Sequence, residues 1–219
     1  MSIRSLTPQR LTAAALIGFV VTLEAQDLVD PTDRAEGAER IAAVAAHPGR
    51  LLLAALLLIA SSALLIPSIV AIVRRITTRG RTLARTGAVL ATLGALGHAA
   101  VAGYYGVLAG APGGDPREMT ELLDRIDHSA AAGAVILPAI AGFALGCFVL
   151  VLALARSGLL PRWVAVVPLA SIVVQAVGFK PWAQIDLSQA VAVMPFAWLG
   201  VRLAAHNVIG SRAPAPAYA

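Results

Sequence analysis

Residues 51–73 read LLLAALLLIASSALLIPSIVAIV, a run of 23 residues without a charged side chain. At a rise of about 1.5 Å per residue, a helix over this run is about 35 Å long, enough to cross the roughly 30 Å hydrocarbon core of a bilayer. The whole chain shares this character: 58% of its 219 residues are hydrophobic, 13% are charged, and the mean hydropathy is +0.81. Soluble domains carry about twice that fraction of charge. We therefore exclude a water-soluble enzyme, a disordered tail and a nucleic-acid-binding protein, and predict an all-α membrane protein.

Apolar stretches on both sides of this run also qualify as spanning helices by length and composition. The first stretch resembles a signal peptide, because Arg4 and Arg10 precede an apolar core. However, Leu23-Glu24-Ala25 places a large residue where a cleavage site needs a small one, so we expect a retained helix. The chain is predicted to form one transmembrane helical domain over residues 1–219, a bundle of six spanning helices at 11–30, 51–73, 86–109, 131–155, 163–179 and 187–205.

The charged residues divide between the two sides of such a bundle. The segments 1–10, 74–85, 156–162 and 202–219 together carry eleven arginines and no acid. The opposite side, which includes the outer third of the first helix, holds all twelve acids, five arginines and Lys180. Basic segments next to spanning helices resist translocation. We therefore predict that both termini are cytoplasmic and that the protein is a multi-pass component of the inner (plasma) membrane.

Two of the outer connections are predicted to form short helices. In residues 115–128, Asp115 is suited to the N-cap, Pro116 to the first helical position, and Glu118 to a capping box. Apolar residues then recur at helical spacing, which predicts an amphipathic helix lying on the outer membrane surface or on the bundle: Met119, Leu122, Leu123 and Ile126. Residues 35–46 are expected to do the same.

A weak internal repeat relates residues 39–109 to 124–179. Glu39-Arg40-Ile41 precedes His47 in the first unit, as Asp124-Arg125-Ile126 precedes His128 in the second. Both units run outside, inside, outside, so the repeat is parallel. In a chain rich in Ala, Leu and Val the same matches also arise by chance, and the sequence does not decide between chance and duplication.

Polar side chains at membrane depth are the informative ones, because burying them is costly without a partner or a purpose. Glu24 and Asp27 lie three residues apart in the outer third of the first predicted helix, so their carboxyl groups share one face. A low-dielectric surrounding favours the neutral carboxyl group, which then carries a transferable proton. The alternative is that the helix ends near Thr22 and both acids are hydrated.

The acids of this region recur at every third position, which invites a comparison with a magnesium site. On an α-helix a three-residue step drifts by about 60° each time, so these side chains cannot share one face. Pro31 also interrupts the run. We interpret the segment as a hydrated loop and predict neither a metal site nor a cofactor for the residues concerned: Glu24, Asp27, Asp30, Asp33, Glu36 and Glu39.

His98 is predicted near the middle of the third helix. Its small neighbours Gly94, Ala95, Gly97 and Gly103 allow another helix to approach closely. Three interpretations are open: a hydrogen bond between helices, a substrate or proton site, and a haem ligand. Haem usually requires a second axial ligand, whereas the other histidines are predicted at helix boundaries or in loops.

Aromatic and polar residues along the later helices complete a predicted cavity. Tryptophans near helix ends are commonly interfacial anchors, which explains Trp163 but explains deeper aromatic residues less well. We predict the following substrate-binding residues: His98, Tyr104, Tyr105, Phe143, Gln175, Phe179, Trp182 and Trp198.

A proton-bearing acid beside an aromatic cavity suits protonation of an alkene or epoxide followed by carbocation cyclisation. Aromatic faces stabilise cations, and a dry cavity protects them from water. In size, helix number and acid placement the chain resembles the bacterial integral-membrane terpene cyclases of drimentine-type indole-sesquiterpenoid pathways. The resemblance spans nearly the whole chain and rests on layout rather than on an alignable motif. It implies a farnesylated indole or cyclodipeptide substrate and catalytic roles for Glu24, Asp27 and Asp186.

Two other functions fit the same residues. A small proton-coupled transporter would use His98 and Gln175, which occupy equivalent positions in the weak repeat. A non-catalytic membrane partner would dock through residues 74–85, which we interpret instead as a topology determinant that binds anionic lipid. The predicted partners are thus a lipophilic small molecule and the lipid bilayer, with no nucleic acid.

Overall fold

The computed structural model describes residues 8–32, 35, 37–77, 79–110, 115–168 and 187–210. Within these ranges every regular element is a helix, which confirms the predicted all-α class for the described part of the chain. Four helical segments among the described residues are long and apolar enough to cross a membrane: α1 (Pro8–Val29), α3 (Pro48–Arg75), α4 (Arg81–Ala109), and Ala130–Arg156.

The fourth of these segments is not one uniform helix. It consists of α6 (Ala130–Leu137), a π-helical turn η1 (Pro138–Gly142) and α7 (Phe143–Arg156). A proline inside a helix removes one backbone hydrogen bond and crowds the preceding turn, which accounts for the break at Pro138. The single helix expected over 131–155 is therefore interrupted.

The two remaining predicted spans are described only in part. The last one, 187–205, lies within α9 (Leu187–Gly210), whose shorter apolar portion is Val193–Ala205. The span predicted at 163–179 falls largely outside the described residues, which show a 3-10 turn, η2 (Arg162–Ala165), at its start.

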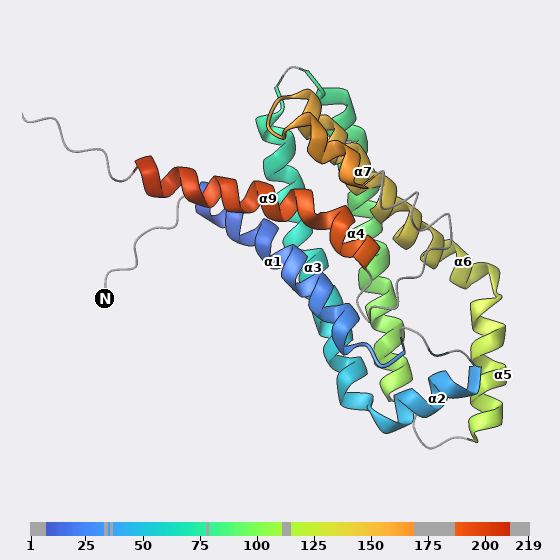
Figure 1. The fold of residues 1–219 in the computed structure, drawn as a ribbon. Coiled ribbons are helices and arrows are strands. Elements are labelled where there is room, and N and C mark those ends of the chain that lie inside the picture. Colours follow the sequence, from blue (N-terminus) through green and yellow to red (C-terminus); the bar gives the residue numbers. More distant parts are fainter. Residues whose placement is uncertain are drawn as a thin grey trace, which may run out of the picture.

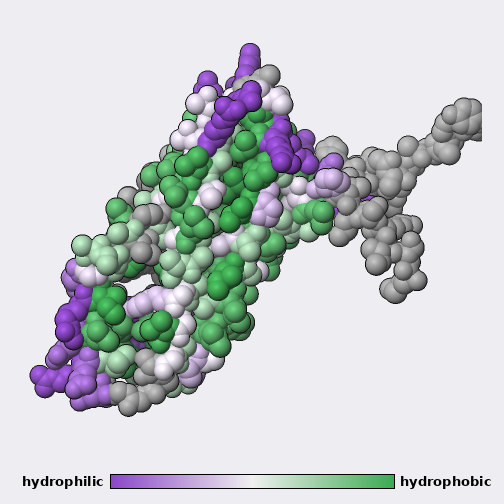
Figure 2. All heavy atoms as spheres, turned by 180° about the vertical axis from the view of Figure 1, so that it is seen from behind, coloured by the Kyte–Doolittle hydropathy of each residue, from purple (hydrophilic) through white to green (hydrophobic). Residues whose placement is uncertain are grey.

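The long helices pack as a bundle in which each contacts the next and α7 also contacts α9. Helix α9 packs on α1, α1 on α3, α3 on α4, and α4 on α7 (Figure 1). The core of this bundle is largely aliphatic, with fully buried residues such as Leu16, Leu65 and Leu150 from three different helices. Figure 2 shows hydrophobic side chains over the middle of the molecule and hydrophilic ones at its two ends. Large apolar residues of the long helices, such as Val21 and Val89, are exposed, as a lipid-facing surface requires.

Small residues bring α4 and α7 into backbone contact. A β-carbon added at Gly94 would overlap the backbone of Phe143, and one at Gly146 would overlap the backbone of Ala91. Membrane helices commonly associate through small residues of this kind. The predicted close approach is confirmed at Gly94, Ala95 and Gly97, which are buried, but not at Gly103, which is exposed with no facing atom within 4 Å of an added β-carbon.

The two ends of the helix bundle, along the direction of its long helices, differ in charge. We call them the acidic end and the arginine end. At the acidic end, α2 (Gly37–Ala46) packs on α5 (Pro116–Asp127), as Figure 1 shows, and both helices confirm the predicted short helices. Asp115 caps α5 as expected, accepting a hydrogen bond of 2.9 Å from the backbone N–H of Arg117. At the arginine end, the turn between α3 and α4 lies against the end of α7.

Candidate functional site: the polar cluster and the aromatic row

Helix α1 continues well past the point where a hydrated loop would have to begin. It ends at Val29, so Glu24 and Asp27 are both helical, and both are half-buried. The Oε1 atom of Glu24 is buried. The Thr22 hydroxyl donates a hydrogen bond of 2.8 Å to the carbonyl of Gly18 and so stays within the helical turn. The alternative in which the helix ends near Thr22 is therefore wrong.

The end of α1 is held by a buried acid that the sequence analysis assigned to a hydrated loop. Asp30 is only 8% exposed, which overturns that expectation at this residue. Its Oδ1 accepts hydrogen bonds from the backbone N–H and the hydroxyl of Thr32, at 2.8 and 2.7 Å. Its Oδ2 accepts one from Nε2 of Gln26, at 3.3 Å. An Asp followed by Pro and Thr is a common turn-forming signal, and this signal could have identified Asp30 from the sequence.

Two tyrosines of α4 and one arginine of α2 gather near Asp30: Tyr105 faces Asp30, and Arg40 packs on Tyr104. The Tyr105 phenol lies close enough to the side chains of Asp30 and Thr32 to interact with them, and the charge of Arg40 acts on the same phenol. The Arg40 guanidinium lies 5.5 Å from the centre of the Tyr104 ring, in cation–π contact. The hydroxyl of Tyr104 and Nε of Arg40 are both buried. We call this set the polar cluster: Gln26, Asp30, Thr32, Arg40, Tyr104 and Tyr105.

The polar cluster thus gathers groups from three helices at the acidic end of the bundle. Glu24 and Asp27 lie on the last two turns of α1, which lead directly into it. Sequence reasoning identified Tyr104 and Tyr105 but did not include Arg40, Gln26 or Thr32 in a site. Arg40 lacked a signal, because only the folding of α2 against α4 and α5 brings it to the tyrosines.

Deeper in the bundle, four rings from four helices form an aromatic row. The ring centres of Phe196 and Phe19 are 6.0 Å apart, those of Phe19 and Phe143 6.1 Å, and those of Phe143 and His98 4.5 Å. The first two pairs are edge-to-face, an arrangement that favours aromatic packing. Phe19 and Phe196 are fully buried, so this part of the row is packed core. The structure therefore brings the two predicted substrate-binding residues His98 and Phe143 together, but their rings pack against each other.

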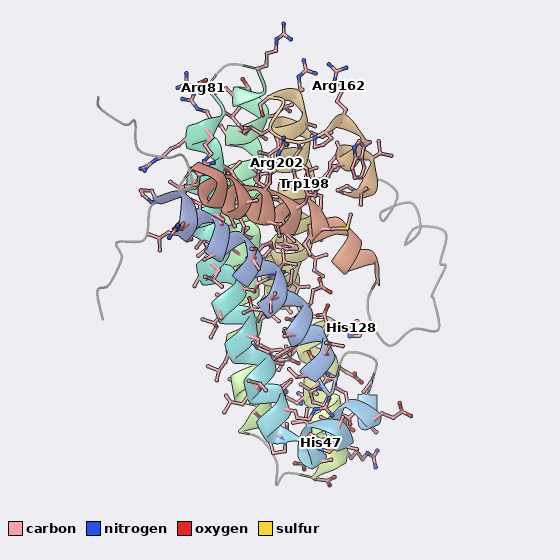
Figure 3. The ribbon with its side chains drawn as sticks, turned by 60° about the vertical axis from the view of Figure 1, so that its left-hand side comes forward. His47, Arg81, His128, Arg162, Trp198 and Arg202 are labelled. Atoms are coloured by element: carbon pink, nitrogen blue, oxygen red, sulfur yellow. The ribbon has the colours of Figure 1, made fainter. Side chains whose placement is uncertain are left out.

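Other predicted site residues lie elsewhere. Trp198 of α9 packs beneath the Arg202 guanidinium, 5.0 Å from the ring centre, at a distance from the labelled His47 and His128 (Figure 3). His47 and His128 are exposed at the acidic end, so neither shares the depth of His98. Among the described residues, no group of three or more His, Cys, Asp or Glu side chains is arranged to hold a metal ion. Four predicted site residues lie outside the described ranges: Gln175, Phe179, Trp182 and Asp186.

Comparisons of the chain with protein-family models, curated proteins and solved structures found no match.

Proposed function

We propose that the chain is a six-span protein of the inner membrane with both termini in the cytoplasm. The charge distribution of the described residues supports this topology. The arginine end carries Arg74, Arg75, Arg79, Arg81, Arg85, Arg156 and Arg162, without an acid in the same segments. The acidic end exposes Glu39, Asp115, Glu118, Glu121 and Asp124. Because basic segments stay cytoplasmic, the arginine end faces the cytoplasm and the polar cluster faces outward.

Within this topology, the proposed activity is acid-initiated cyclisation of a lipophilic isoprenoid, such as a farnesylated indole or cyclodipeptide. The observation that carries the proposal is the pair of helical carboxyl groups on α1, one of them with a buried oxygen, next to a cluster of tyrosines. The acid O–H adds its proton to one carbon of a substrate double bond, and the other carbon becomes a cation. A second double bond attacks that cation and closes a ring. Loss of a proton to the carboxylate then restores the acid, so the product is an isomer of the substrate.

Each part of the proposed site has a physical role in that sequence. A neutral carboxyl group survives in a low-dielectric surrounding because ionisation there is costly. Aromatic faces lower the energy of passing cations, and the tyrosines of the polar cluster offer such faces. Exclusion of water prevents early quenching to an alcohol. No metal or redox cofactor enters this scheme.

Incubation of membranes that contain the protein with a farnesylated indole tests the activity. We expect cyclised isomers from the wild type and a loss of at least about a hundredfold for Glu24→Gln or Asp27→Asn, the usual scale of acid catalysis. Glu39→Gln is the matched control, because Glu39 is an exposed acid of α2. Full activity in both α1 variants would remove the acid assignment, and no product from wild type would remove the cyclase proposal.

A second candidate, a small proton-coupled transporter, is favoured by one separate observation. The π-helical turn η1 packs against α4, where an added β-carbon at Gly97 would lie 2.5 Å from Cα of Ala139. His98 is the next residue along α4. π-Helical turns are frequent at functional sites, and interrupted helices recur at transporter binding sites. Proton uptake into proteoliposomes that depends on an added substrate, and that His98→Gln abolishes, would favour this function over cyclisation.

A further inference from the structure

A small cleft lies at the arginine end, where α3 turns into α4. Its volume is about 270 Å³, and none of the predicted catalytic or substrate-binding residues lines it. Three of its lining side chains are arginines, and two others, Val73 and Ile76, are apolar. The lining residues are Val73, Arg74, Ile76, Thr77, Arg81 and Arg85. Figure 3 places Arg81 at the same end of the molecule as Arg162.

The arginines around this cleft carry like charges that repel one another, and a bound anion would relieve this repulsion. Arg81 and Arg85 are separated by one helical turn, a spacing at which like charges destabilise a helix. The chain has no acid between Glu39 and Asp115, so neither α3 nor α4 contains a carboxylate that could balance them. Arg156 adds to the positive field, since its Cβ lies 3.4 Å from the position a β-carbon of Gly80 would occupy.

The start of α4 adds a second, independent preference for an anion. Its first turn contains no acidic residue, and its N-cap residue, Gly80, offers no side-chain acceptor to the free backbone N–H groups. A helix N-terminus carries partial positive charge and commonly binds anions, phosphate groups in particular. Arg81, at the first position of α4, therefore places a full positive charge where the helix itself favours a negative one.

We propose that this cleft binds a phosphate group, with Arg74, Arg81 and Arg85 as its ligands. Guanidinium groups match phosphate oxygens in pairs and form short, charge-assisted hydrogen bonds. The apolar Val73 and buried Ile76 beside them suit a phosphate attached to a hydrophobic body. The phosphate comes either from an anionic phospholipid headgroup or from a soluble phosphate compound. This proposal does not depend on the cyclisation reaction.

Native mass spectrometry of the full chain in detergent tests the binding. The lipid probe is phosphatidylglycerol, and phosphatidylcholine with the same acyl chains is its control. The soluble probes are inorganic phosphate and diphosphate. Their binding is measured as the shift that they cause in the unfolding temperature of the protein. We expect the double substitution Arg81→Gln, Arg85→Gln to weaken phosphate binding at least about tenfold, because each charge-assisted bond is worth about that factor.

The matched control is the double substitution Arg75→Gln, Arg79→Gln. It removes the same charge from exposed arginines of the same connection that do not line the cleft. We expect this variant to bind within about twofold of the wild type, since neither side chain lines the cleft and water screens their exposed charges. If circular dichroism shows that the first double variant does not fold, Arg74→Gln replaces it. Arg74 also lines the cleft but lies in the last turn of α3, so this substitution leaves α4 unchanged.

The outcomes separate the sources of phosphate. Selective retention of phosphatidylglycerol, lost in the cleft variant, assigns a lipid headgroup. A rise in unfolding temperature with inorganic phosphate or diphosphate, also lost in that variant, assigns a soluble ligand. Binding of neither kind of probe, or an equal loss in both double variants, would overturn the proposal.

Discussion

The imidazole of His98 lies against the ring of Phe143, with their centres 4.5 Å apart and their planes inclined by 38°. This contact exists because α4 and α7 approach so closely that their backbones touch at Gly94 and Gly146. The only polar ring in the middle of α4 is therefore placed at the helix interface, beside the π-helical turn that precedes α7. Of the two candidate functions, the transporter depends on this interface through His98, whereas the cyclase rests on the carboxyl groups of α1.

Substituting Gly94 tests whether backbone contact holds α4 and α7 together. Gly94→Ala places a methyl group against the Phe143 backbone, which cannot move as a side chain can. We expect the free energy of unfolding, measured by chemical denaturation in detergent, to fall by about 1–3 kcal/mol, as for other overpacked cores. Gly103→Ala in the same helix is the control, and its exposed position predicts no loss or a gain of up to about 1 kcal/mol. Equal effects of both substitutions would contradict the close packing.

The turn between α3 and α4 depends on Gly80 for two reasons. Its φ of 89° is in the left-handed region, and an added β-carbon would lie 2.8 Å from the carbonyl oxygen of Ala153. Gly158 has a similar φ of 80° but no atom within 4 Å of an added β-carbon. We expect Gly158→Ala to cost about 1–2 kcal/mol, the conformational cost alone. Gly80→Ala should lower the unfolding temperature further, and a smaller effect than that of Gly158→Ala would show that the turn does not rest on α7.

The buried carboxylate of Asp30 is expected to stabilise the end of α1. Asp30→Ala leaves the Thr32 backbone N–H without its acceptor inside a buried turn, at a cost of about 1–3 kcal/mol in the free energy of unfolding. Asp30→Asn keeps the oxygen that accepts both Thr32 bonds and should cost less. Asp115→Ala removes an exposed cap of similar geometry and is expected to cost about 1 kcal/mol. An effect of Asp30→Ala no larger than that of Asp115→Ala would mean that burial adds nothing.

Cysteine labelling tests the proposed topology. Cys147, which is buried, is first replaced by alanine to give a background without a thiol. Arg79→Cys and Glu121→Cys are then added to this background one at a time. Both positions are exposed, at the arginine end and in α5 respectively. With a membrane-impermeant maleimide, we expect labelling at residue 121 in intact cells and at residue 79 only after permeabilisation. The reverse pattern would invert the topology and place the polar cluster in the cytoplasm.

The parts of this protein that could be predicted from the sequence are those set by local composition. Apolar length identified residues 51–73 and three other segments as helices that can cross a membrane. Capping signals at Asp115 and Pro116 predicted α5 correctly, because caps act between near neighbours in the chain. The predicted limits of the helices were less accurate. Helix α4 begins at Arg81 rather than at residue 86. Arginine is a good helix former, and a search for apolar residues does not detect helix propensity. Sequence likewise showed that Glu24 and Asp27 share one helical face but not how deeply each is buried.

Apolar length and the sorting of charge thus follow from the order of residues, because the bilayer selects for them segment by segment. The meeting of Arg40 with Tyr104, of Asp30 with Tyr105, and of three arginines around one cleft depends on how the helices are arranged in space. That arrangement rests on glycines at which two backbones touch, and on a proline that converts one turn of helix into a wider one. Such contacts join residues far apart in the chain, so no local pattern encodes them.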